Sequence, residues 1–187
     1  DYITIAQQGN AVDFGDADVA CVTQTGGLNS PTRGIFAGGY TPSETNNISY
    51  ITFMTTGNAS DFGDMTYSKA RRPGGASNAI RGLIAGGNHY DGSASVGQDT
   101  IDFFTIATLG NASDFGDLQN ADTESTAGCS SPTRAVFFTS KTVTGEESNV
   151  LSYVQIMTTG NAIDFGDSTT SNRWGKGGTS NGHGGLG

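Results

Sequence analysis

The residues with the clearest capacity for chemistry are pairs of carboxylates that recur along the chain. The tetrapeptide Asp-Phe-Gly-Asp occurs four times, with successive copies about fifty residues apart. Paired aspartates can hold Ca²⁺, and kinases hold Mg²⁺ with an Asp-Phe-Gly segment. The sequence lacks the other kinase motifs and the spacing of an EF-hand, so we expect no cofactor and keep Ca²⁺ as the alternative. The carboxylates are Asp13, Asp16, Asp61, Asp64, Asp114, Asp117, Asp164 and Asp167.

A basic residue also recurs at matching places in the repeats, as Arg33, Arg81 and Arg134, with His183 in the tail. A guanidinium group can bind a carboxylate and a backbone carbonyl at the same time, which makes it a specific cross-link. We therefore predict that these arginines pair with the Asp-Phe-Gly-Asp carboxylates and that both sets are structural.

Catalytic combinations are scarce in this sequence. His89 and His183 are the only histidines, and neither has a recognisable Ser or Cys nucleophile as a partner. We predict no catalytic residue and a protein that is not an enzyme. The alternative is a glycan-cleaving enzyme that works with a carboxylate pair.

Binding is expected where the repeats differ, because the shared positions serve packing and the variable loops are free to bind. The variable loops cover residues 41–47, 88–100 and 141–150. Aromatic and hydrogen-bonding side chains in and beside them suit stacking on sugars. The predicted ligand-binding residues are Tyr40, His89, Tyr90, Asp91 and Glu146.

The elements that must position these residues are short strands. A Gly-Asn-Ala step precedes every Asp-Phe-Gly-Asp copy and predicts a turn between two strands. The segments before that step, such as residues 48–53 and 101–106, are rich in β-branched and aromatic residues with apolar side chains on both faces. Apolar segments that end in Gly-Gly, such as 34–39, predict a further strand in each unit. The chain is therefore predicted to be all-β.

The repeats also predict how the chain is divided. Units cover about 17–64, 65–117 and 118–167, while residues 168–187 and 1–16 supply the two halves of a fourth. Joined, these halves would close a ring and hide the edges of the sheets. We predict one domain, 1–187, of four four-stranded units with one unit closed by the terminal strands. The alternative is an excerpt of a larger ring.

The charge excludes some partners. A net charge of −9 and a pI near 4.3 oppose binding to phosphate backbones, so we expect no nucleic acid. No apolar run approaches the length of a membrane span, so we expect no membrane insertion.

The strand ending in Ala-Gly-Gly-Tyr at residues 37–40, the later aromatic strand and the repeat period resemble kelch repeats. The chain is also similar over nearly its whole length to the degenerate kelch-like repeats of marine bacteriophage virion proteins, through residues 30–34, 37–40, 50–52 and 56–64. The resemblance implies a small β-propeller in a tail fibre or another virion component, located on the virion or outside the cell. It implies a structural or adhesive function, with a host-surface glycan or a neighbouring virion protein as partner. A secreted or cell-surface lectin is the alternative, and an oligomer stays open.

Overall fold

The computed structural model describes residues 1–20, 26–40, 43–67, 72–120, 123–142, 144–172 and 177–179. These residues form strands, turns and extended segments and no helix, which confirms the predicted all-β class. Accordingly, the described part of the chain offers no helix that could cross a membrane.

Most strands belong to three four-stranded antiparallel sheets. In the first and third sheets, hydrogen-bonded neighbours are consecutive strands, whereas in the second sheet one pair of neighbours is separated in sequence by a hairpin. The first sheet contains β1 (Gly26–Asn29), β2 (Arg33–Ala37), β3 (Asn47–Thr52) and β4 (Ser60–Asp64). The second contains β5 (Gly74–Ser77), β6 (Arg81–Ala85), β9 (Thr100–Thr105) and β10 (Ser113–Asp117). The third contains β11 (Thr123–Ser130), β12 (Arg134–Thr142), β13 (Ser148–Gln155) and β14 (Ile163–Asn172). A separate hairpin of β7 (Asn88–Tyr90) and β8 (Ser95–Gly97) lies between β6 and β9 in sequence.

The Asp-Phe-Gly-Asp copies at 61–64, 114–117 and 164–167 produce a β-bulge in the outermost strand of each sheet. In the first sheet Gly63 pairs with Ile48 and Asp61 with Ser49, so Phe62 is the extra residue. The same shift occurs around Phe115 and Phe165. Gly63 has φ +144°, a conformation that favours glycine. The bulge turns the phenylalanine towards the neighbouring sheet, where Phe62 is 2 % and Phe115 3 % exposed.

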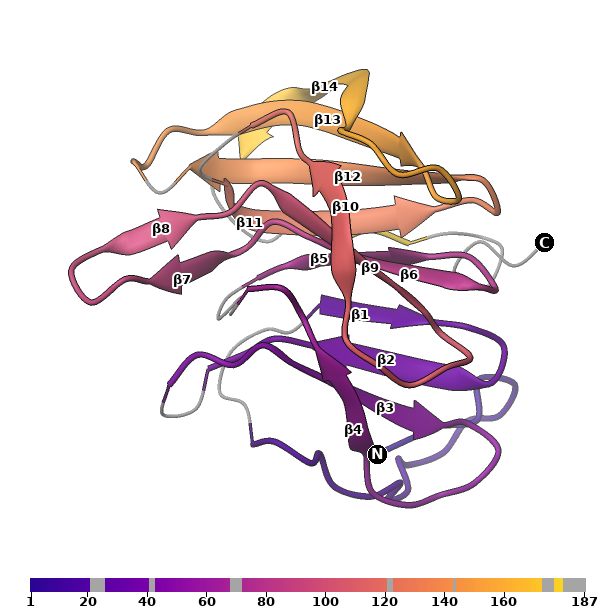
Figure 1. Ribbon diagram of the computed structural model, residues 1–187. Coiled ribbons are helices and arrows are strands. Elements are labelled where there is room, and N and C mark those ends of the chain that lie inside the picture. Colours follow the sequence, from indigo (N-terminus) through magenta and orange to yellow (C-terminus); the bar gives the residue numbers. More distant parts are fainter. Residues whose placement is uncertain are drawn as a thin grey trace.

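The core lies between successive sheets. One cluster joins the first sheet to the second, and the other joins the second sheet to the third. In Figure 1 the first sheet extends downward from β1, the third extends upward from β11, and the second lies between them. The first cluster includes Ile35, Ile48, Phe62, Ile84, Phe104 and Ile106, and the second includes Leu83, Ile101, Phe115, Phe137, Val154 and Ile156.

The innermost strands approach one another at glycines. A Cβ atom on Gly75 would lie 2.2 Å from the carbonyl oxygen of Gly27, and one on Gly128 would lie 2.3 Å from that of Gly75. Gly178 continues the series, because its Cβ would lie 2.1 Å from the Gly128 oxygen. Gly75, Gly128 and Gly178 are therefore required by close backbone contact between the innermost strands.

The described segments at the two chain ends contact different sheets. Tyr2 forms a bridge with Val12, and residues 14–18 contact the first sheet. β14 extends to Asn172, which pairs with Ser148 of the third sheet. No strand pairing joins residues 1–20 to 168–172 or 177–179, and residues 180–187 of the predicted fourth unit lie outside the described residues.

Candidate functional site

The Asp-Phe-Gly-Asp motif binds the Gly-Asn-Ala step of the following repeat. Between the first and second sheets, the Gly110 amide donates to the Phe62 carbonyl at 2.9 Å, and the Ala112 amide donates to the Asp64 carbonyl at 2.7 Å. The Asp64 amide in turn donates to Asn111 Oδ1 at 3.1 Å. We call these three hydrogen bonds the inter-repeat latch. The two most regular motifs of the sequence are thus the two halves of one contact.

The latch occurs at three boundaries. Gly57, Asn58 and Ala59 hold Phe14 and Asp16 in the same way, and Gly160, Asn161 and Ala162 hold Phe115 and Asp117. This corrects our prediction that Gly-Asn-Ala forms the tight turn between two strands. That turn is made earlier, where the Thr55 amide donates to the Thr52 carbonyl at 3.2 Å. Local turn preference could not reveal the long-range partner.

The first aspartate of each motif is occupied within the motif. Asp61 Oδ1 accepts the Gly63 amide at 3.1 Å, and the equivalent bonds join Asp13 to Gly15, Asp114 to Gly116 and Asp164 to Gly166. No cluster of three or more His, Cys, Asp or Glu side chains that could hold a metal ion exists among the described residues. The carboxylates therefore have a local structural use, which stabilises the bulge.

Asp117 is the motif carboxyl with a perturbed proton affinity. Burial raises its pKa first, and the carboxylates of Asp99 and Asp114 raise the pKa further, while a hydrogen bond with Asn161 lowers it. A raised carboxyl pKa suits a proton donor, but it also follows from packing acidic repeats against each other.

The arginines contact backbone carbonyls and aromatic rings rather than the predicted carboxylates. Arg33 Nη1 donates to the Ile106 carbonyl at 2.7 Å, and Arg81 Nη1 donates to the Ile156 carbonyl at 3.0 Å. The guanidinium carbon of Arg33 lies 4.8 Å from the centre of the Tyr50 ring, and that of Arg81 lies 4.5 Å from Phe103. Arg134 lies 5.1 Å from the Tyr153 ring.

The predicted pairing of these arginines with the Asp-Phe-Gly-Asp carboxylates is therefore wrong. Each arginine begins the second strand of its sheet, and its side chain crosses the aromatic residue of the third strand. Arg33 and Arg81 then each reach a backbone carbonyl of the next sheet's repeat. The first aspartate of the motif instead accepts a glycine amide of the same motif, as Asp61 does from Gly63 and Asp114 does from Gly116. The acceptor of Arg33 and of Arg81 is thus a neutral backbone carbonyl rather than a carboxylate.

Several predicted ligand residues gather at one end of the sheets. Tyr40 bridges to Glu44, and a Glu44 carboxylate oxygen accepts the Tyr90 amide, which joins the β2–β3 connection to the β7–β8 hairpin. His89 Nδ1 lies 3.0 Å from Nε2 of Gln98, which directly follows the facing strand β8. Tyr90 is 57 % exposed. We call Tyr40, Glu44, His89, Tyr90 and Gln98 the loop patch.

The remaining two predicted ligand residues have different surroundings. Asp91 Oδ1 accepts the amides of Ser93 and Ala94, which closes the hairpin turn. Those bonds, Ala94 first, lower the pKa of the Asp91 carboxyl, and His89 adds to the effect. Glu146 is bonded to Thr142 in the β12–β13 turn. That turn lies on the same side of the molecule as the β7–β8 hairpin (Figure 1), but Glu146 is not bonded to the loop patch.

Sequence reasoning missed Glu44 and Gln98, which organise the loop patch, because their partners lie on other strands.

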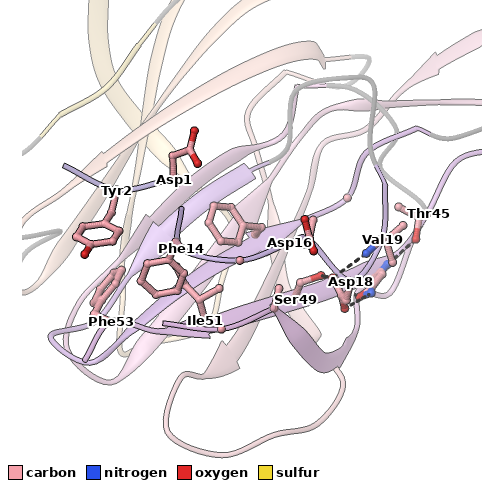
Figure 2. A pocket seen from close by; sticks show the side chains of 17 residues that line it. Asp1, Tyr2, Phe14, Asp16, Asp18, Val19, Thr45, Ser49, Ile51 and Phe53 are labelled. Carbon is pink, nitrogen blue, oxygen red and sulfur yellow. Dashed lines mark hydrogen bonds between the residues drawn. The ribbon is translucent and has the colours of Figure 1, made fainter. Parts of the chain in front are cut away.

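Sequence reasoning also missed a cavity of about 480 Å³ between residues 14–19 and the first sheet. Figure 2 shows Tyr2, Phe14 and Phe53 on one side of this cavity, and Asp18 bonded to Ser49 on the other.

No protein-family model matches the chain, and no curated protein matches it.

Proposed function

We propose that this protein is a non-enzymatic structural or adhesive module with a kelch-like β-propeller fold. The observation that carries the proposal is the use of the repeated polar residues. The first aspartate of each motif binds a glycine amide of the same motif, while the latch asparagines and two of the recurrent arginines bind backbone groups of a neighbouring repeat. The repeated polar side chains therefore hold the repeats together, which leaves the variable loops for recognition.

The fold proposal is supported by the arrangement of the sheets. Each is a four-stranded meander, and β1, β5, β11 and residues 177–179 line one cavity of about 370 Å³ with their glycines in contact. Four-stranded blades around a central channel define a propeller. We propose four blades, the fourth built from the two chain ends.

The loop patch is the proposed binding surface, and a host-surface glycan is the proposed ligand. Tyr90 and Tyr40 supply aromatic faces for stacking on a sugar ring, while His89 and Gln98 supply hydrogen-bonding groups. Glu44 fixes the backbone at Tyr90, so the hairpin is held against the neighbouring loop before any ligand binds. A neighbouring virion protein is the other proposed partner, with the virion surface as the location.

A glycan array tests this proposal. We expect binding to at least one glycan without release of a cleaved sugar, and loss of binding in Tyr90→Ala. Tyr90→Phe should keep most of the affinity, because it retains the ring. Met54→Ala is the matched control, since Met54 is exposed at the opposite end of β3. A cleaved sugar product would instead identify the glycan-cleaving alternative, and no binding to any glycan would exclude a glycan as the ligand.

A further inference from the structure

The strands β3, β9 and β13 each carry an aromatic ring with an arginine guanidinium group over its face. The guanidinium carbon lies 4.5–5.1 Å from the ring centre in the three pairs, which are Arg33 with Tyr50, Arg81 with Phe103 and Arg134 with Tyr153. A cation in this position is attracted by the negative face of the ring. Each of the three sheets therefore contains one place for a cation beside its third strand.

Tyr2 is a fourth ring of this series, although it lies outside the three sheets. It meets the ring of Phe14 edge-on, with the ring centres 6.0 Å apart, and Phe14 belongs to the first Asp-Phe-Gly-Asp copy. Tyr50 meets Phe62 of the second copy in the same way, also at 6.0 Å. Tyr2 is 42 % exposed, and no arginine of the described residues lies over its ring.

The carbonyl group that completes such a cation place is present as well. Arg33 donates to the carbonyl of Ile106 in the repeat of the second sheet. Phe53 holds the equivalent position in the first sheet, because its amide donates to the Thr32 carbonyl at 3.0 Å. The Ile106 amide likewise donates to the Ile80 carbonyl at 2.8 Å. Within the described part of the chain, no hydrogen bond is donated to the Phe53 carbonyl.

Tyr2 and Phe53 line the same cavity, the one of about 480 Å³ beside the first sheet. Figure 2 shows them with Phe14 at one end of it. The cavity has the size of a typical ligand site, which is about 300–1,000 Å³. Phe36 and Ile51 add to its apolar wall. A wall of this kind suits the methylene stem of a long cationic side chain.

The charge around the cavity favours a cation. The described residues of its lining include the carboxylates of Asp16 and Asp18 and no Lys, Arg or His. Asp18 accepts hydrogen bonds from the Ser49 hydroxyl at 2.5 Å and from the Val19 amide at 2.9 Å, and neither donor is charged. The whole chain carries a net charge of −9. A cationic group is therefore attracted to the cavity, whereas an anionic group is repelled.

We propose that this cavity binds an arginine side chain of a partner protein, with the guanidinium group over the Tyr2 ring and a hydrogen bond donated to the Phe53 carbonyl. The partner's side chain then repeats the contacts that Arg33 makes between the first and second sheets. Arginine fits better than lysine, because its planar group stacks on a ring and donates hydrogen bonds at the same time. The site is formed by residues 1–2, 14–19 and the first sheet, and it is separate from the loop patch.

Titration with single amino-acid derivatives, followed by amide NMR, tests the ligand chemistry. The probes are N-acetyl-arginine amide, N-acetyl-lysine amide and N-acetyl-citrulline amide, which has the shape of the arginine derivative without its charge. We expect the arginine derivative to shift the resonances of Phe14, Asp18 and Phe53. The citrulline derivative should bind about fivefold to tenfold more weakly, and the lysine derivative should also bind more weakly. Equal affinity for the arginine and citrulline derivatives, or no shift with the arginine derivative, would overturn the proposal.

Variants of Tyr2 test the role of the ring. Tyr2→Leu keeps an apolar side chain and should weaken binding of the arginine derivative about fivefold, while binding of the citrulline derivative stays nearly unchanged. Tyr2→Phe is the matched control, and it should bind like the wild type because it keeps the ring. A Tyr2→Leu protein that binds the arginine derivative as tightly as the wild type would show that the cation does not lie over this ring.

A pair of aspartate variants tests the contribution of the cavity's own charge. Asp18→Asn keeps an oxygen that can accept from Ser49 but removes the negative charge, so it should weaken binding of the arginine derivative. Asp167→Asn removes an acidic group from a residue outside the cavity lining and should have a smaller effect. Equal effects of the two variants would mean that only the net charge of the protein attracts arginine, which would contradict a specific site.

Two further measurements separate this site from the other candidates. Tyr90→Ala should leave binding of the arginine derivative unchanged, so a failure of the glycan proposal and a failure of the arginine site are distinguishable. Light scattering should show a monomer. A dimer whose formation shifts the Tyr2 and Phe53 resonances without any added probe would show that a second copy of the chain fills the cavity, and it would overturn the proposal.

Discussion

The amide of Asp64 donates to Asn111 Oδ1 at 3.1 Å across the boundary between the first and second sheets. The bond joins residues 47 positions apart in sequence, and its equivalents recur at the two other described boundaries. It converts two local motifs into the contact that orders successive sheets.

Removing that side chain should weaken the boundary. Asn111→Ala leaves the Asp64 amide without its acceptor, and we expect it to lower the free energy of unfolding by about 1 kcal/mol. Chemical denaturation measures the change. Gln8→Ala, at an exposed residue, is the control, and an equal effect of both variants would contradict a specific role for the latch.

The arginine cross-link should depend on both its hydrogen bond and its ring contact. Arg81→Met leaves the buried Ile156 carbonyl unpaired and is expected to cost about 2 kcal/mol of unfolding free energy. Arg81→Lys should cost less, because a lysine can reach the carbonyl but lacks the planar group that stacks on Phe103. Equal stability of Arg81→Met and the wild type in urea titrations would exclude the cross-link.

The inner glycines should not tolerate a side chain. Gly75→Ala places a methyl group 2.2 Å from the Gly27 oxygen, so the two backbones must separate. We expect a loss of about 3 kcal/mol or more, measured by thermal unfolding. Gly9→Ala has nothing within 4 Å of the new carbon and serves as the control. A tolerated Gly75→Ala would show that the inner strands are further apart.

Asp117 should make stability depend on pH. Burial, and then the charges of Asp99 and Asp114, raise its pKa in the folded protein above the ordinary value of 3.8. The folded state therefore binds this proton more tightly, so stability falls as pH rises from 3.8 through the folded pKa and stays reduced above it.

Asp117→Asn removes this charge and keeps the backbone latch. The variant should be more stable than the wild type at neutral pH, and the difference should disappear near pH 3, where the wild-type carboxyl is protonated. Thermal melts over this pH range measure it. Asp164→Asn controls for loss of one acidic group elsewhere, and an Asp117→Asn protein less stable than wild type at neutral pH would contradict the direction.

The sequence by itself determined the all-β class and the repeat, because β-branched segments and glycine-rich turns encode strand formation locally. It also singled out Tyr40, His89 and Tyr90 as predicted ligand residues, since variation among repeats is visible without coordinates. Only the tertiary structure decided what the repeated residues bind. Asn111 meets Asp64, Arg81 meets the Ile156 carbonyl and Glu44 meets the Tyr90 amide across boundaries that no local preference encodes. Periodicity shows that positions are equivalent, whereas a partner is fixed by the packing of one sheet on the next.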